Sequence, residues 1–474
     1  MPVSKHYSPA PRFPALGPEF SDPVAPADFP RHHVRWRNQA WAERVGLGAL
    51  NDAEWIAHFG MFKPLPNNIP TPLAMRYHGH QFQSYNPNLG DGRGFLFAQL
   101  RDDRGRLLDL ATKGSGQTPW SRQGDGRLTL KGGFREVLAA AMLAAQGVYT
   151  SKAFSLIETG EQLARNDEPS PTRSAVLTRL SHSHIRFGTF QRHAFLGATD
   201  NLKALVDHCI ENYWPEHSAL DGEARVAAFV RSVSIASAEL CASWMAAGFV
   251  HGVLNTDNMV ITGESFDYGP WRFLPEANPN FTAAYFDQNG LYAYGRQPHA
   301  VFWNLKQLAG ALTSLCDKDA LVDAISAYPP AFARAQREKL CARLGVCSQG
   351  SEADGAMLDA FFAFMGRTKA PWDSVFHDWF GGNASEQRAA HAPNAALYET
   401  EEAKTWLSLF RTYEPDRPVR LTHPYFLRQT PVSLVIEEVE AIWAPIAEAD
   451  DWSLFQSTLA DIASLQEALS LANP

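Results

Sequence analysis

The chain has 474 residues, 45% of them hydrophobic, with 13 tryptophans and a formal net charge of −9. This length exceeds one typical folding unit, and the apolar content predicts a large packed core. The negative charge balance excludes wholesale nucleic-acid binding as a function, because such binding requires a basic surface.

Cysteine usage and hydropathy indicate the cellular environment. The cysteines are odd in number and form no Cys-x-x-Cys pair: Cys209, Cys241, Cys316, Cys341 and Cys347. This pattern argues against a disulfide framework or a zinc ribbon and favours a reducing compartment. No apolar run reaches the roughly 20 residues of a membrane span. Residues 1–30 contain eight prolines and no apolar signal-peptide segment. We therefore expect a cytoplasmic protein with no membrane partner, whose first residues form an extended arm over the surface.

The first half of the chain is predicted to be rich in strands. Apolar residues in 34–60 are spaced for one face of a helix, and a proline-rich linker follows at 64–72. Residues 94–100 and 107–113 are typical of two strands, separated by a turn that contains Gly105. The sequence therefore predicts a hairpin at 94–113.

Helices are predicted to dominate the second half. A helix rich in Ala and Leu is expected at 134–146, ended by Gly147, and a strand at 176–180. From about residue 201 most segments have helical periodicity, including a long apolar helix at 227–247. The order indicates an α+β fold in which a strand-rich part leads into a helical part.

The most informative motif follows that long helix. His251 and Asn258, with Asp267 and Gly269 beyond them, have the layout of a protein-kinase catalytic loop and metal-binding Asp-x-Gly motif. However, the position of the catalytic aspartate holds Val253, which cannot accept a proton. The protein is therefore either an inactive kinase or an enzyme that uses ATP for a different reaction.

Three polar residues of this region are candidates for chemistry. Asn258 and Asp267 supply the oxygen ligands that Mg²⁺ prefers, although Asp267 by itself also fits a turn cap. Asp257 is the nearest carboxylate that could replace the missing base. A loop cap or an indirect metal contact is the alternative role for Asp257, and the sequence does not decide between them.

Several residues upstream are candidates for binding phosphates. Lys113 ends a predicted strand and Glu136 lies on the next helix, the order in which a kinase lysine and its glutamate partner occur. Glycine-rich segments allow backbone N–H groups to approach phosphates, although such segments also form plain turns. The candidates in these segments are Gly90, Gly92, Arg93, Asp125 and Gly126.

Two arginines and two His-x-His pairs are further polar candidates. Arg179 and Arg186 could bind a terminal phosphate through bidentate hydrogen bonds, or form two surface salt bridges. The histidine pairs at 78–80 and 182–184 lack a supporting Cys/His cluster, so we expect structural roles for them.

Together these residues resemble the selenoprotein O family, a group of kinase-fold protein adenylyltransferases. The resemblance runs from about Met75 to Gln307. It is carried by residues 78–82, 85–94, 113–119, 121–127, 135–136, 183–188, 251–259 and 266–270.

The resemblance implies a specific reaction. ATP would bind flipped relative to ordinary kinases, with its γ-phosphate buried and its α-phosphorus facing a Ser, Thr or Tyr hydroxyl of a protein substrate. AMP would be transferred and pyrophosphate released, and UMP transfer with Mn²⁺ is a variant that the sequence leaves open. The implied roles are proton acceptor for Asp257, Mg²⁺ ligands for Asn258 and Asp267, and nucleotide or phosphate contacts for Gly90, Gly92, Arg93, Lys113 with Glu136, Asp125, Gly126, Arg179 and Arg186.

The resemblance also implies a kinase-like bilobal fold with additions at both ends. We expect an N-terminal extension that wraps the core (1–72), a strand-rich nucleotide-binding lobe (73–178), a lobe with the catalytic loop and metal site (179–310), and a helical region packed on that second lobe (311–474).

Two segments depart from the family pattern. Many members carry a cysteine or selenocysteine near the C-terminus, whereas the last cysteine here is Cys347, so we expect no redox control by a terminal thiol. The family's Asn-Pro-Lys segment reads His423-Pro424-Tyr425 here, and target recognition is expected to differ.

Two alternatives to the adenylyltransferase remain open. One is a conventional phosphotransferase with Asp257 as base. The other is a catalytically silent pseudokinase that binds nucleotide and scaffolds partners. The joint presence of Lys113, Glu136, Asn258 and Asp267 weighs against the second, because a silent site need not keep them.

Overall fold

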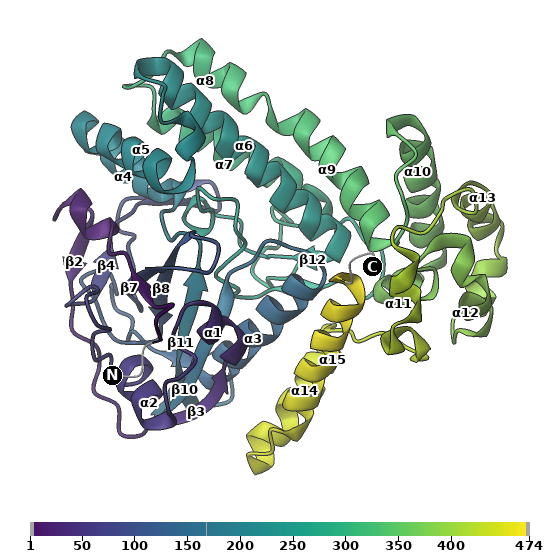
Figure 1. Cartoon of the computed structure of the whole chain (residues 1–474), viewed down its shortest axis with the longest axis horizontal. Helices are drawn as coiled ribbons and strands as arrows, with labels where there is room; N and C mark the ends of the chain where they lie inside the picture. Colours follow the sequence, from purple (N-terminus) through teal and green to yellow (C-terminus); the bar gives the residue numbers. More distant parts are fainter. Residues whose placement is uncertain (1–3, 167, 471–474) are drawn as a thin grey trace.

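The computed structural model describes residues 4–166 and 168–470, which form a mixed α+β protein. An antiparallel sheet built from the first part of the chain lies on one side, and helices α4 to α9 lie above it in the view of Figure 1, with α8 and α9 outermost. Helices α10 to α13 form a separate helical body, and α14 and α15 return toward the sheet side (Figure 1). The strand-rich part therefore precedes the helical part, as the sequence predicts.

The main sheet has the strand order β2-β4-β7-β8-β11-β10-β3, with β1 paired to β7 and β9 paired to β11. Every pairing within it is antiparallel. The strands are β1 (Ser8–Pro9), β2 (Ser21–Pro23), β3 (His33–Arg37), β4 (Leu73–Met75), β7 (Leu96–Arg101), β8 (Leu107–Lys113), β9 (Leu128–Thr129), β10 (Lys152–Leu163) and β11 (Thr172–Ser181). A small hairpin, β5 (Gly79–Gln81) and β6 (Ser84–Asn86), lies outside this sheet.

The predicted hairpin and the helix after it are confirmed. Strands β7 and β8 pair around a turn in which Asp102 accepts backbone hydrogen bonds from Arg104 and Arg106. Helix α3 (Leu130–Ala145) begins earlier than predicted, because the Thr129 hydroxyl caps its first turn by accepting from the Gly132 amide.

The single helix predicted at 34–60 is wrong. Residues 33–37 form the edge strand β3, which pairs with β10. Two short helices follow, α1 (Gln39–Arg44) and α2 (Asp52–Phe59), and the side chains of Asn38 and Asn51 cap them. Apolar spacing alone did not separate these segments, because the pairing partner of β3 lies more than 100 residues away in the chain.

The first residues are more than an arm over the surface. Strands β1 and β2 join the main sheet, and Phe13 and Phe20 are buried in the core. The amide of Phe13 donates to the side chain of Gln99 on β7 at 2.7 Å. The N-terminal segment is therefore an integral part of the sheet side of the molecule.

The helices of the second part build two packed bodies. Helix α6 lies at the centre of the first body and packs against α9, while α10 packs against α13 in the second.

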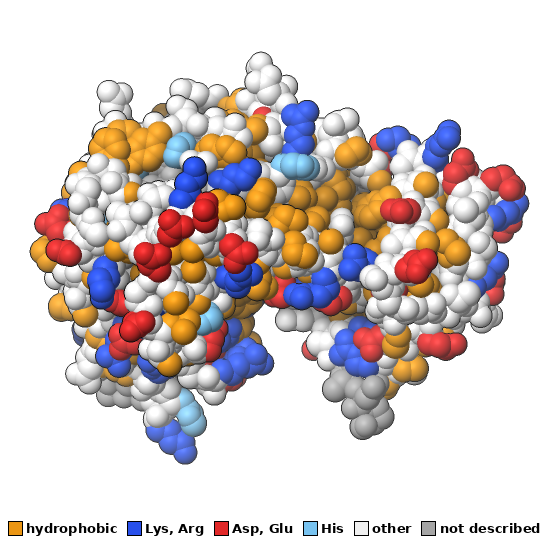
Figure 2. Space-filling model, turned by 90° about the horizontal axis from the view of Figure 1, so that it is seen from above, with side chains coloured by type: hydrophobic (Ala, Val, Ile, Leu, Met, Phe, Trp, Pro, Cys, Tyr) orange, Lys and Arg blue, Asp and Glu red, His pale blue; other side chains and the backbone are white. Residues whose placement is uncertain are grey.

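Seen from the side of α8 and α9, apolar side chains gather in the hollow between the larger body and the smaller one (Figure 2). The helices are α4 (Phe187–Phe195), α5 (Thr199–Tyr213), α6 (Gly222–Ala247), α7 (Gln297–Ala311), α8 (Lys318–Ile325), α9 (Tyr328–Arg343), α10 (Ser351–Thr368), α11 (Trp372–Asp378), α12 (Glu386–His391), α13 (Glu401–Phe410), α14 (Ile436–Ala449) and α15 (Ser453–Ser470).

Helix α6 is a core helix. It is the one described helix that is long and apolar enough to cross a membrane, but 61% of its most apolar window is buried inside the protein. Its apolar character is accounted for by packing against neighbouring helices.

The last two helices contact the sheet side of the molecule. The ring of Phe134 on α3 lies 5.3 Å from the rings of both Trp443 on α14 and Phe455 on α15. Lys131 on α3 forms an ion pair with Glu440 at 2.7 Å. The sequence placed the whole region 311–474 on the second lobe, whereas α14 and α15 pack along α3, the helix that carries Glu136.

Buried histidines make the fold sensitive to acid. Burial lowers the pKa of both His182 and His193 to about 4, so both rings are neutral in the folded protein near pH 7. In the unfolded chain they bind protons near pH 6.5. Stability contributed by the neutral rings is present above pH 6.5 and is lost as the pH falls toward 4.

We expect the free energy of unfolding to drop by on the order of 1–3 kcal/mol per histidine between pH 6.5 and pH 4, measured by urea denaturation at a series of pH values. The slope should flatten in His193→Gln, and an unchanged slope in that variant would contradict the assignment.

Candidate active site

A cleft of about 650 Å³ lies where the β7–β8 hairpin, two glycine-rich loops and the loop after α6 meet. Its lining contains seven Lys or Arg residues and four Asp residues, so an anionic ligand fits it best. The predicted site residues among its lining are Gly90, Gly92, Arg93, Lys113, Asp125, Gly126, Arg179, Arg186, Asp257 and Asp267. Residues far apart in the sequence are thus brought to one place.

A compact group of charges lies at the inner end of the cleft. Lys113, the last residue of β8, forms an ion pair with Glu136 of α3 through Oε1. The same ammonium group lies 2.7 Å from Oδ1 of Asp267, and a guanidinium nitrogen of Arg179 lies 2.9 Å from that oxygen. Burial alone would raise the pKa of Asp267, but Lys113 and Arg179 outweigh it and hold this pKa well below its usual range. Asp267 is therefore an anion at neutral pH.

Asn258 and Asp267, the predicted metal ligands, each keep a side-chain oxygen that no described residue occupies. The Asn258 amide nitrogen donates to the Val253 carbonyl at 2.9 Å, which orients the side chain and leaves its oxygen as an acceptor. Both contacts of Asp267 use Oδ1, and no described residue donates to Oδ2. No group of three or more His, Cys, Asp or Glu side chains in the described residues could hold a metal by itself. The donor set fits Mg²⁺, which typically takes one or two protein oxygens and completes its shell with phosphates and water.

Asp257 is another carboxylate of the cleft with an oxygen that lacks a hydrogen-bond partner. Its side chain lines the cleft, the residue is only 9% exposed, and its buried Oδ1 has no hydrogen-bond partner among the described residues. Burial raises the pKa of Asp257 to about 6, with Arg186 opposing the shift and Asp267 adding to it. Buried acceptors are nearly always paired, so this shielded oxygen is an exception, and a ligand reaches Asp257 through the part of its side chain that lines the cleft.

The loop that carries these residues is held on both sides. His251 is buried, and its Nε2 lies 3.1 Å from the carbonyl oxygen of Phe266, just before Asp267. The hydroxyl of Thr256 accepts a hydrogen bond from the His80 amide at 2.7 Å. The β5–β6 hairpin therefore rests on the loop, and His80 has the structural role that the sequence predicts.

The two glycine-rich segments form one wall. The hydroxyls of Thr118 and Ser121 donate to the carbonyls of Asp91 and Gly92, which ties the segments together. A side chain at Gly94 would place Cβ 2.0 Å from the carbonyl oxygen of Thr112, so only glycine fits there. These segments therefore form one side of the cleft in addition to making turns.

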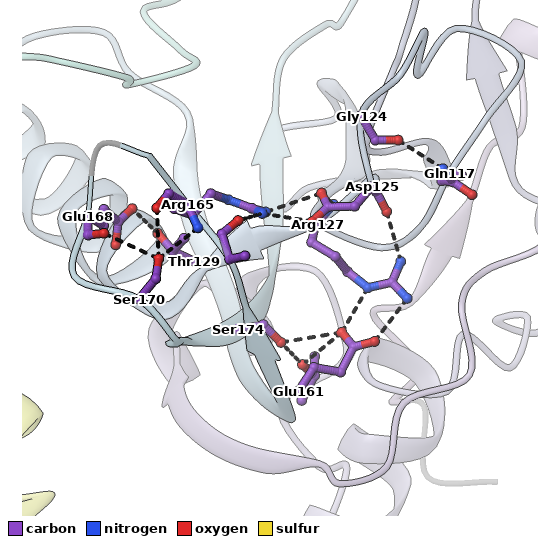
Figure 3. A network of polar contacts seen from close by, with 12 residues as sticks. Gln117, Gly124, Asp125, Arg127, Thr129, Glu161, Arg165, Glu168, Ser170 and Ser174 are labelled. Carbon is purple, nitrogen blue, oxygen red and sulfur yellow. Dashed lines mark hydrogen bonds and ion pairs between the residues drawn. The ribbon is translucent and has the colours of Figure 1, made fainter.

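Asp125 is held by its neighbours at the outer end of this wall, as Figure 3 shows. Its carboxylate pairs with Arg165 at 2.8 Å and accepts from the Arg127 amide at 2.9 Å, while the Arg127 side chain pairs with Glu161. Burial would raise the pKa of Asp125, but the Arg165 hydrogen bond and the Arg127 amide lower it overall. Sequence reasoning missed Arg165, which lies in the β10–β11 connection and carries no motif.

The two arginines between the halves are buried, which excludes the surface salt-bridge alternative. Arg179 and Arg186 are each 5% exposed and line the cleft. Arg186 lies 3.1 Å from Asp91 and 4.3 Å from the centre of the Tyr77 ring. Tyr77 and Asp91 are further lining residues that the sequence analysis did not single out. Asp91 lies within the glycine-rich segment, and that position was the only available signal.

Comparisons with known proteins agree with this arrangement. The family profile described as "Protein adenylyltransferase SelO" matches residues 3–463. Over 469 residues the chain is 42% identical to the protein nucleotidyltransferase YdiU of Synechocystis, covering 96% of this chain and 97% of that protein. It is 42% identical to the YdiU protein of Gloeobacter violaceus, covering 94% and 92% of the two chains, and 38% identical to that of Vibrio cholerae, covering 84% and 79%. The chain therefore belongs to the SelO family of protein adenylyltransferases.

Proposed function

We propose that this nucleotidyltransferase moves AMP from ATP to Ser, Thr or Tyr hydroxyls of proteins, with release of pyrophosphate. The observation that carries the proposal is the separation of roles in the cleft. The phosphate-binding and metal-binding residues of a kinase are present, but position 253 is valine, and Asp257 is the carboxylate of the same loop that lines the cleft.

The distribution of charge supports a flipped nucleotide. Lys113, Arg179 and Arg186 line the cleft and are all buried. Positive charge is therefore concentrated at the inner end of the cleft. Three cations suit the inward-facing β- and γ-phosphates, whose oxygens accept bidentate hydrogen bonds from arginine. The α-phosphorus then faces outward, where an acceptor protein has access.

The reaction is an in-line displacement at the α-phosphorus. The acceptor hydroxyl oxygen forms the new bond, and the bond from the α-phosphorus to the bridging oxygen of pyrophosphate breaks. Asp257 takes the hydroxyl proton. Lys113 and the two arginines neutralise the charge that gathers on the leaving pyrophosphate.

Asn258 and Asp267 are proposed to hold Mg²⁺, which would neutralise phosphate charge when bound. Mn²⁺ satisfies the same oxygen ligands, and UMP transfer with Mn²⁺ is the variant of this reaction to be tested in parallel.

A kinase-like two-lobed organisation accounts for the position of the cleft. In this proposal, residues 73–178 form the nucleotide-binding lobe together with strands β1 to β3 from residues 1–72, and residues 179–310 form the lobe with the catalytic loop. Residues 311–474 are an addition whose last two helices contact the first lobe. We propose a cytoplasmic location, consistent with five unpaired cysteines, four of them buried.

A conventional phosphotransferase is the second candidate, because Asp257 could equally accept a proton during γ-phosphoryl transfer. The test supplies ATP labelled on either the α- or the γ-phosphate, with Mg²⁺ and a general protein substrate. We expect label from the α-phosphate only. Label from the γ-phosphate would establish a kinase, and bound ATP with no transfer of either label would establish the silent scaffold.

A further inference from the structure

Aromatic side chains gather on an exposed surface beside the loop that carries Asp257. Phe82, Tyr285 and Phe286 are 38%, 81% and 47% exposed. The ring centres of Phe82 and Phe286 are 5.8 Å apart, and those of Tyr285 and Phe286 are 5.2 Å apart. These three residues form the aromatic patch. Contiguous exposed aromatic groups are costly in water and typically mark a binding surface.

The patch is attached directly to the loop of the candidate active site. The side-chain oxygen of Asn255 accepts from the Phe82 amide at 3.0 Å and from the Tyr292 hydroxyl at 2.8 Å. Asn255 lies two residues before Asp257, and Gln81, next to Phe82, lines the cleft. The patch therefore borders the cleft at the side of Asp257.

The turn that presents Phe82 is unfavourable for the residues it contains. Phe82 and Gln83 connect β5 and β6 with φ angles of +49° and +62°, both in the left-handed region. Two-residue hairpin turns of this kind prefer Asn-Gly, and each left-handed non-glycine residue costs about 1 kcal/mol or more. The Asn255 contact holds this conformation in place. The Phe82 ring also packs on Tyr292 with ring centres 5.0 Å apart, so the unfavourable turn presents a phenylalanine whose inner edge is held and whose outer part is exposed.

We propose that the aromatic patch docks the acceptor polypeptide by an apolar side chain near the hydroxyl that receives the nucleotide. This inference rests on the proposed function, since the family acts on proteins and the attacking hydroxyl must approach Asp257. The patch carries no charge, so an aromatic or leucine-sized side chain suits it and an acidic one does not. An apolar side chain packed over Phe82 and Phe286 would cover their exposed ring surface and place the acceptor chain across the mouth of the cleft.

The test compares short acceptors on matched variants. Peptides of uniform length carry one central Ser, Thr or Tyr, with Phe, Leu, Asp or Ala placed in turn at each flanking position. AMP transfer from α-labelled ATP gives kcat/KM for each peptide. The variants are Phe286→Ala and the double variant Phe82→Ala/Phe286→Ala. Leu409→Ala is the control, because Leu409 is an apolar residue with the same 38% exposure as Phe82 and lies on α13.

For the wild type we expect higher kcat/KM with Phe or Leu than with Asp or Ala at one preferred position. The double variant should lose about tenfold on those peptides, mainly through KM, with less than threefold change on Ala peptides and unchanged KM for ATP. Leu409→Ala should behave like the wild type.

Three results would overturn the proposal. If the wild type transfers α-label but the double variant treats all peptides as the wild type does, the docking role fails while the proposed function stands. If the wild type transfers no α-label, the proposed function fails and the docking role with it. If the wild type self-associates in sedimentation and the double variant does not, the patch is an interface between copies of the chain.

Discussion

Replacing Asp267 by alanine is expected to lower nucleotide transfer by about 10³-fold or more. The carboxylate has two partners in the structure, Lys113 at 2.7 Å and Arg179 at 2.9 Å, and it is one of the two proposed metal ligands. Its loss removes the metal clamp and leaves two buried cations with Glu136 as their remaining acidic partner. The measurement is the initial rate of α-label transfer per mole of folded protein over a range of Mg²⁺ concentrations.

Controls separate the chemical loss from destabilisation. Asp267→Asn keeps the shape and removes the charge, and we expect a comparable loss of transfer. Asp354→Ala removes another buried carboxylate, in α10, where it accepts from Ser348 and Tyr413. That variant should be less stable yet transfer at the normal rate per folded molecule. Full, metal-dependent activity in Asp267→Ala would show that the metal site is assigned wrongly.

Replacing Asp257 by asparagine is expected to lower kcat by about 10²–10³-fold while ATP binding changes little. The amide has nearly the same size as the carboxylate and retains an acceptor oxygen for a turn. It cannot take a proton from the acceptor hydroxyl. This substitution therefore decides between the two roles that the sequence leaves open for Asp257, because a loop cap would survive it and a base would not.

Asp125→Asn is the matched comparison, because it makes the same chemical change on another wall of the same cleft. It weakens the ion pair with Arg165, so we expect a higher KM for ATP with kcat nearly kept. Equal loss of kcat in both variants would mean that the change acts through cleft structure. Normal kcat in Asp257→Asn would remove Asp257 as the proton acceptor.

The residues of the cleft were easier to predict than the fold, because their motifs lie within short segments of the chain. The spacing from His251 to Asn258 and on to Asp267 is a property of one short segment, so a motif records it completely. The lysine at the end of β8 and the glutamate on α3 follow from short-range signals, a hairpin turn and an Ala- and Leu-rich helical pattern ended by Gly147. Contacts such as Arg186 with Asp91, or Arg165 with Asp125, join segments that no motif links.

By itself the sequence identified most of the residues that meet in the cleft, the hairpin and the major helices, and the valine at position 253 where a kinase has its catalytic aspartate. Only the tertiary structure decided that residues 33–37 are a strand, that the N-terminal segment belongs to the sheet, and that α14 and α15 pack along α3. It also decided the ionisation of Asp257 and Asp267 and the exposure of the aromatic patch. Periodicity and capping report hydrogen bonds made within a few residues, whereas strand partners, burial and pKa depend on which distant surfaces meet.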